Sequence, residues 1–142
     1  MSKTLLRLGE FERRILLSLR PELSVIPNRP PRPGKQAYES HHLAVTRLHQ
    51  IGLIDFGKQR VHTEWYPNVW RQSPRRSYTL RYVYRREIYL TEFGQRLVKR
   101  IRPRLESGEE IRWKRHLPKL LKPDSHLLQG FDRFRAALQQ CQ

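Results

Sequence analysis

Apolar residues near the start of the chain recur at spacings of three, four and seven, a pattern typical of one buried helical face. The stripe consists of Leu5, Leu8, Ile15, Leu16 and Leu19, and Arg13, Arg14 and Arg20 lie off it. Pro21 then ends the pattern, because proline lacks a backbone N–H and clashes with the preceding helical turn. We therefore predict an amphipathic helix before residue 21.

A second helix is predicted over residues 37–51. Its buried stripe is Ala44, Leu48 and Ile51, with Val45 beside it. Gly52 follows directly, where a glycine commonly ends a helix. Five prolines in residues 21–33 separate the two helices, so the connector over residues 21–35 is predicted to be extended rather than helical.

A β-hairpin is predicted over residues 53–90. Residues 53–56 are short and strand-like, and residues 78–90 are rich in Tyr, Val, Ile and Thr, which favour strands. In the second strand, one face would carry Tyr78, Leu80, Tyr82 and Tyr84, and the other Arg81, Val83 and Arg85. The long turn between the strands holds two tryptophans, Trp65 and Trp70.

The chain after the hairpin predicts helices. Thr91 stands at a helix N-cap position, with Leu97, Val98 and Ile101 as the buried face and Pro103 as the end or kink of the helix. A short basic helix around residues 109–116 and a connector over residues 117–124 follow. The last predicted helix covers residues 125–140. Its narrow apolar seam consists of Leu127, Phe131, Phe134 and Leu138.

These elements predict a mainly α fold with a β-hairpin, an α+β class with additional N- and C-terminal helices. We expect a domain over residues 1–105 and a C-terminal helical extension over residues 106–142. The seam of the last helix lies behind a proline-containing connector, so Leu127, Phe131, Phe134 and Leu138 are predicted to form a homodimer interface. The alternative is that this helix packs on its own domain.

The charge of the chain indicates a polyanionic partner. Its 142 residues include 29 Lys+Arg and 13 Asp+Glu, which gives a formal net charge of +16. Residues 58–104 hold 13 of the basic residues and three acids, so they carry +10 of this excess. Nucleic acid is the first candidate partner, and an acidic membrane surface or an acidic protein is the second.

Two short strings resemble the MarR- and PadR-like winged helix-turn-helix transcription regulators. In this family the recognition helix often ends in R-L-x-x-x-G-L-[VI], here Arg47-Leu48 and Gly52-Leu53-Ile54. The wing typically returns into Y-x-L-T-x-x-G, and the chain is close to it at residues 89–94, with Tyr89 directly before Leu90. The resemblance covers residues 36–100. Residues 21–33 stand where the family has a positioning helix, and residues 23–26 are expected to form a short turn or strand instead.

The resemblance implies a winged helix-turn-helix fold in which the second helix enters the DNA major groove. The residues expected to read bases are Ser40, His42, Thr46 and Arg47. The residues expected to contact phosphates or the minor groove are Tyr38, Lys58, Arg60, Arg71, Arg75, Arg76 and Arg81. Trp65 and Trp70 have two interpretations: stacking on unpaired bases, or covering a small core or a partner chain.

No catalytic or metal site is predicted, and no cofactor. His41 and His42 are adjacent on a helix and point apart, so with Glu39 and His49 they lack the geometry of a metal site. The chain has only three Asp, which is few for a metal-dependent nuclease. The single Cys141 excludes an internal disulfide. No signal peptide, membrane span or small-molecule effector pocket is evident, so we expect a cytoplasmic, nucleoid-associated protein.

The function predicted from sequence is a sequence-specific regulator that binds double-stranded DNA, most simply a repressor acting as a homodimer. The alternative is an RNA-binding module, or an accessory module of a nucleoprotein complex in replication, transposition or conjugation. In either case the protein is expected not to be an enzyme.

Overall fold

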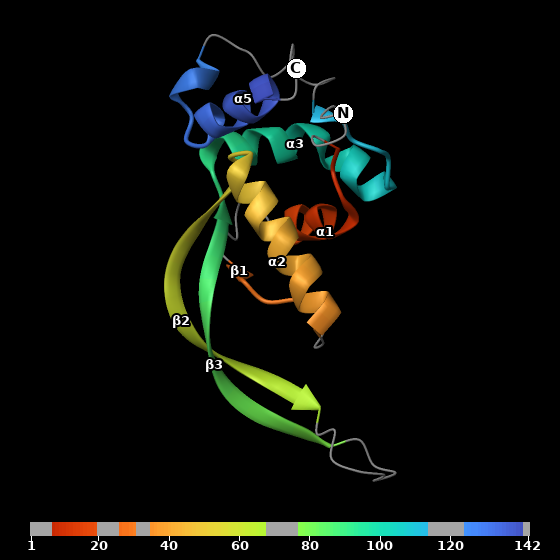
Figure 1. Cartoon of the computed structure of the whole chain (residues 1–142), viewed down its shortest axis with the longest axis vertical. Coiled ribbons are helices and arrows are strands. Elements are labelled where there is room, and N and C mark those ends of the chain that lie inside the picture. Colours follow the sequence, from red (N-terminus) through yellow and green to blue (C-terminus); the bar gives the residue numbers. More distant parts are fainter. Residues whose placement is uncertain (1–6, 20–25, 31–34, 68–76, 114–123, 141–142) are drawn as a thin grey trace.

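The computed structural model covers the whole chain and describes residues 7–19, 26–30, 35–67, 77–113 and 124–140. Within these residues the fold is α+β, with four α-helices and a three-stranded antiparallel sheet (Figure 1). The helices are α1 (Glu10–Ser18), α2 (Lys35–Gln50), α3 (Glu92–Ser107) and α5 (Phe131–Gln140), with a short 3-10 turn, η2 (Ser125–Leu127). None of the helices described is both long and apolar enough to cross a membrane.

The sheet has the order β1-β3-β2 and consists mainly of the predicted hairpin. Strands β2 (Ile54–Pro67) and β3 (Tyr78–Leu90) pair along their length, with an irregularity between Phe56 and Gln59. Strand β1 (Ile26–Pro27) pairs only with the base of β3, where Ile26 lies opposite Ile88. Residues 26–27 of the proline-rich connector therefore form a short strand, which agrees with the extended chain predicted there. Of the turn or strand expected over residues 23–26, all but Ile26 lies outside the described residues. Away from this base the hairpin extends well beyond the helices (Figure 1).

Close backbone contacts join the end of α2 to the start of α3, the two places where the sequence motifs lie. Gly52 ends α2 with φ +81°, and Leu53 N–H donates to the carbonyl of Leu48 at 3.0 Å, which is the bonding expected of a Schellman cap. Thr91 caps α3: its hydroxyl accepts from Gly94 N–H at 3.0 Å and donates to the carbonyl of Gly52 at 2.6 Å. Gly130 lies against Gly52 from the C-terminal side. We call Gly52, Thr91, Gly94 and Gly130 the glycine junction.

A cluster of aromatic rings joins α3 to the C-terminal helix. The ring of Phe93 lies 5.3 Å from that of Phe131 and 4.9 Å from that of Phe134, between centroids. Trp113 packs edge-on against Phe134 at 6.1 Å, and all four side chains are buried. The C-terminal extension therefore shares one hydrophobic core with the rest of the described fold.

This packing corrects the predicted dimer seam. Phe131, Phe134 and Leu138 are buried inside their own chain, whereas Leu127 lies outside α5 and is exposed. Helical spacing indicates that a face is buried but not which chain covers it. The predicted helix over residues 125–140 also breaks, because Gly130 has φ +92° and α5 begins only after it.

Two further expectations about helices are corrected. The first helix begins at Glu10, so the buried Leu8 precedes it and is held by a hydrogen bond from its N–H to the carbonyl of Ile111. Helix α3 continues through Pro103 to Ser107, where Gly108 caps it with φ +77°, so Pro103 does not end the helix, and the alternative of a kink there stays a prediction. Arg13 also stabilises this helix end. It was expected off the buried stripe of α1 but is 8% exposed, with its guanidinium directed at the C-terminus of α3.

Arg13→Met is expected to destabilise the protein by about 2–3 kcal/mol, because charged donors to buried carbonyls contribute more than neutral ones. The guanidinium donates to the carbonyls of Leu105 at 3.0 Å and Arg104 at 3.3 Å, and also to that of Glu109. These carbonyls stand at or just beyond the negative end of α3. The measurement is the free energy of unfolding in urea.

The neighbouring Arg14→Met is the matched control. Arg14 is exposed, with a side-chain ion pair to Glu10 at 3.6 Å, so its replacement should cost less than about 0.5 kcal/mol. Equal costs for the two variants would refute the assignment of Arg13 as a helix cap.

Candidate nucleic-acid interface

Helix α2 presents one exposed face that is opposite its buried stripe. His41, Ala44, Val45 and Leu48 face the interior. On the outward side Leu43 is 67% exposed and His42 is exposed beside it, whereas Tyr38 is 56% exposed at the edge of the stripe, two turns before Val45. The rings of Tyr38 and His42 stack with centroids 6.3 Å apart. The N-terminal half of α2 thus offers a polar and apolar surface that no described element covers.

The predicted base-reading residues divide into two groups. His42 is exposed, and Ser40 and Thr46 are half-buried on the same helix. Sequence reasoning did not select Leu43, although its position opposite Ala44 and Leu48 on the helical wheel is a signal that could have found it. Tyr38, expected at the phosphates, is exposed at the start of α2.

Arg47 is not free to read a base. Its Nε lies 3.2 Å from the Oε1 of Glu12, and its Nη2 donates to the carbonyl of Arg7 at 2.9 Å. Burial raises the pKa of Glu12, although the N–H of Gly9 and the charge of Arg47 act in the opposite direction. Arg47 therefore joins α2 to α1 and to the segment before it. The prediction that Arg47 reads a base is corrected, because its guanidinium pairs with the buried carboxylate of Glu12 on another helix.

The cations predicted on the hairpin are partly described. Lys58, Arg60 and Arg81 are exposed, with Arg60 2.9 Å from Glu87 and Arg81 over the ring of Tyr66. The predicted contacts of Arg71, Arg75 and Arg76 lie outside the described residues, as does Trp70. Trp65 is 67% exposed, so it does not cover the core of its own chain.

A network of charged residues, not foreseen from the sequence, lies midway along the hairpin. Glu64 on β2 is buried and accepts from the Nε and Nη2 of Arg85 on β3 at 3.0 and 3.2 Å. Tyr66 donates to Glu64 at 2.9 Å, and Arg29 after β1 lies 3.8 Å from it. The hydrogen bonds from Arg85 hold the pKa of Glu64 below its ordinary value. Alternation along the strands puts these residues on one face, but only the fold brings Arg29 to them.

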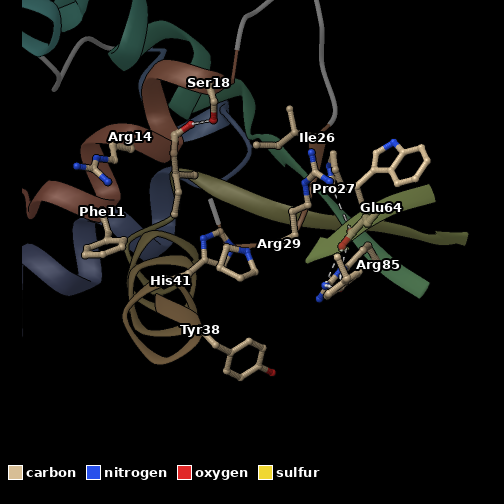
Figure 2. A pocket seen from close by; sticks show the side chains of 14 residues that line it. Phe11, Arg14, Ser18, Ile26, Pro27, Arg29, Tyr38, His41, Glu64 and Arg85 are labelled. Atoms are coloured by element: carbon tan, nitrogen blue, oxygen red, sulfur yellow. Dashed lines mark hydrogen bonds and ion pairs between the residues drawn. The ribbon is translucent and has the colours of Figure 1, made fainter. Parts of the chain in front are cut away.

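This network borders an open cleft of about 790 Å³ between α1, the start of α2, β1 and the hairpin (Figure 2). Phe11 and Ile26 supply apolar walls, and His41 lines the cleft from α2, where its Nε2 donates to the Oδ1 of Asn28 at 2.7 Å. No sequence motif pointed to this cleft. In the described part of the chain, no group of three or more His, Cys, Asp or Glu residues is placed to hold a metal ion.

The stability of the fold is expected to fall as the pH drops below about 6.5, through His41. Burial, followed by the charges of Arg85 and His42, lowers the pKa of His41 from its ordinary value of 6.5. The unfolded chain then binds a proton more readily than the folded one, so the contribution is present above pH 6.5 and lost on acidification. Urea unfolding of wild type and His41→Gln at pH 7.5 and 5.5 measures this, and the variant should lose less stability.

His126→Gln is the control, because this imidazole is exposed on η2 and is not among the groups that shift the pKa of His41. The control should follow the wild type at both pH values. The same acid-induced loss in the His41→Gln variant as in the wild type would contradict the assignment.

Comparison with known proteins adds no relative. A scan against models of protein families, a search of curated proteins and a search of solved structures each found no match. The assignment of a function therefore rests on the residues and geometry of this chain.

Proposed function

We propose that the protein binds double-stranded DNA, with α2 in the major groove and the β2–β3 hairpin against the neighbouring backbone or minor groove. The observation that carries this proposal is the shared direction of the two elements. The start of α2 and the hairpin both project from the helical part of the fold toward the same end of the molecule (Figure 1). A helix fits the major groove, and a flanking hairpin reaches the next stretch of backbone.

The order of elements supports a winged helix-turn-helix domain. A helix precedes β1, α2 lies between β1 and β2, and α3 follows the hairpin, with the sheet order β1-β3-β2. The two motif strings shared with MarR- and PadR-like regulators meet at the glycine junction, where they fix the end of α2 and the start of α3. The proposed domain departs from that pattern at β1, which occupies part of the segment expected to hold the positioning helix.

The charge distribution separates affinity from sequence choice. Residues 58–104 contain 13 Lys+Arg and three acids, so the hairpin and α3 supply the attraction to phosphates. The exposed part of α2 instead carries Tyr38, His42 and Leu43, which suit hydrogen bonds to base edges and contact with a thymine methyl group. The protein would then regulate transcription by occupying its DNA site, and the simplest form is repression, in which the bound protein covers a promoter. A homodimer on a palindrome stays a prediction, and it would use surfaces other than the α5 seam.

The experiment is repeated selection of tight binders from a pool of random duplexes, followed by sequencing. A sequence-specific reader should enrich one short motif. Retention of all duplexes without enrichment would leave only non-specific attraction to phosphate and would contradict the proposal.

A further inference from the structure

One face of the hairpin carries a row of exposed apolar and aromatic side chains. Residues directly opposite one another in paired strands share a face, and alternate residues of one strand do too. By this rule the row contains Val61, Trp65, Tyr78, Leu80, Tyr82 and Tyr84, which we call the apolar ladder. Val61 pairs with Tyr84, Trp65 with Leu80, and Thr63 with Tyr82 between them.

Core packing does not explain the ladder. Tyr82 and Tyr84 are 76% and 70% exposed, and the other members are at least 42% exposed. The buried contacts of the sheet lie elsewhere: Ile88 and Leu90 join the core at its base, and Glu64 and Arg85 pair on the opposite face of the hairpin. Large contiguous apolar patches on a folded protein mark binding surfaces. The ladder therefore requires an occupant.

Charge selects the kind of occupant. Arg86 shares the ladder's alternation on β3, and Lys58, Arg60 and Arg81 are exposed elsewhere on the same two strands, within a chain of net charge +16. A second copy of the chain would bring a second net charge of +16 against the first and would be repelled. A polyanion with flat apolar groups is complementary to both features. Nucleic acid has both, since each base offers a π-face and each phosphate a negative charge.

The occupant must have unpaired bases, because a duplex buries its base faces in its own stack. Successive ladder residues on one strand are about 7 Å apart, which allows separate bases to lie on neighbouring rings. The ladder lies on the hairpin that the proposed function places beside a bound duplex. We infer that the apolar ladder stacks on unpaired nucleotides of a DNA strand that continues from the duplex held by α2, as at a junction between double and single strands. This inference rests on the proposed function for the duplex contact.

The test uses the full chain and fluorescence anisotropy with three probes. These are a blunt duplex, the same duplex with an oligothymidine overhang, and the duplex with an oligouridine overhang. The protein variants are Tyr82→Thr with Tyr84→Thr, which removes two rings but keeps good strand formers, and Tyr82→Phe with Tyr84→Phe, which keeps the rings. All three proteins carry the same charge, and their melting temperatures check that each is folded.

The oligothymidine overhang should tighten binding to wild type and to the Phe variant by at least about tenfold, the effect expected of stacking on one ring. The Thr variant should lose this gain while binding the blunt duplex as wild type does. Loss of the gain in the folded Thr variant supports the inference, whatever the affinity for the blunt duplex. If the blunt duplex is not bound by any of the proteins, the proposed function fails separately.

Several results would overturn the inference. One is a gain from the overhang that the Thr variant retains, and another is no gain in wild type. A larger gain from oligouridine than from oligothymidine would assign the ladder to RNA. Self-association of wild type that is absent in the Thr variant would assign it to a second copy of the chain.

Discussion

Gly130→Ala should destabilise the protein by about 3–5 kcal/mol, a large part of the stability of a small domain. Two effects add at this position. Gly130 has φ +92°, where a side chain is strained, and an added Cβ would lie 2.0 Å from the carbonyl oxygen of Gly52 and 2.6 Å from the Oγ1 of Thr91. The carbonyl of Gly52 and the hydroxyl of Thr91 cannot move away without breaking the hydrogen bonds that cap α2 and α3. The measurement is urea unfolding, and we expect a population that is largely unfolded at modest urea concentrations.

Gly108→Ala separates these two effects. Gly108 also has a positive φ, +77°, but an added Cβ meets nothing within 4 Å among the described atoms. Its replacement should cost only the backbone strain, about 1–2 kcal/mol. If both variants lost the same stability, the close approach of Gly52 and Gly130 would contribute nothing to the free energy of unfolding. The stabilising role of the glycine junction would then be refuted.

The double substitution His42→Ala with Leu43→Ala should weaken binding to the selected duplex by about 100-fold and leave binding to random duplexes nearly unchanged. Both side chains are exposed at the start of α2, and each lost base contact costs about 1–3 kcal/mol. The formal charge is unaltered, so the phosphate attraction and its salt dependence should persist. Anisotropy titrations with the selected and the random duplexes measure the ratio of the two affinities.

Gln50→Ala is the matched control on the same helix. Gln50 is exposed at the other end of α2, beside the core, and its replacement should change neither affinity by more than about twofold. An equal loss on selected and random duplexes in the double variant would show that α2 contributes no sequence choice. Unchanged binding to both would remove α2 from the interface.

Much of the fold could be predicted from short-range patterns. The α2 stripe, the stop at Gly52, the second hairpin strand and the N-cap at Thr91 are confirmed, because spacing and backbone conformation are local properties. The first strand, predicted only over residues 53–56, instead continues to Pro67, so Trp65 lies in β2 and not in the turn. The irregular elements were harder. The prolines of the connector predicted extended chain and β1 bears this out, whereas α3 continues past Pro103 because Gly108 and Arg13 support its end.

The long side chains account for most corrections at the site. Arg13 reaches carbonyls about ninety residues away in sequence, and Arg47 reaches Glu12 on another helix. Glu64 is buried against Arg85, and Arg29 lies near the same carboxylate, so these charges pair with one another across the fold. A sequence pattern lists such charges but not their partners. The apolar ladder shows the reverse case, since alternation predicted the tyrosine row and only the fold shows that nothing described covers it.

Whether α2 reads duplex DNA is decided by competition between the selected duplex and a shuffled duplex of the same composition for the full chain at about 150 mM salt. We expect the selected duplex to bind at least about 10³-fold more tightly, the ratio typical of specific readers. Equal affinity for the two duplexes would contradict it.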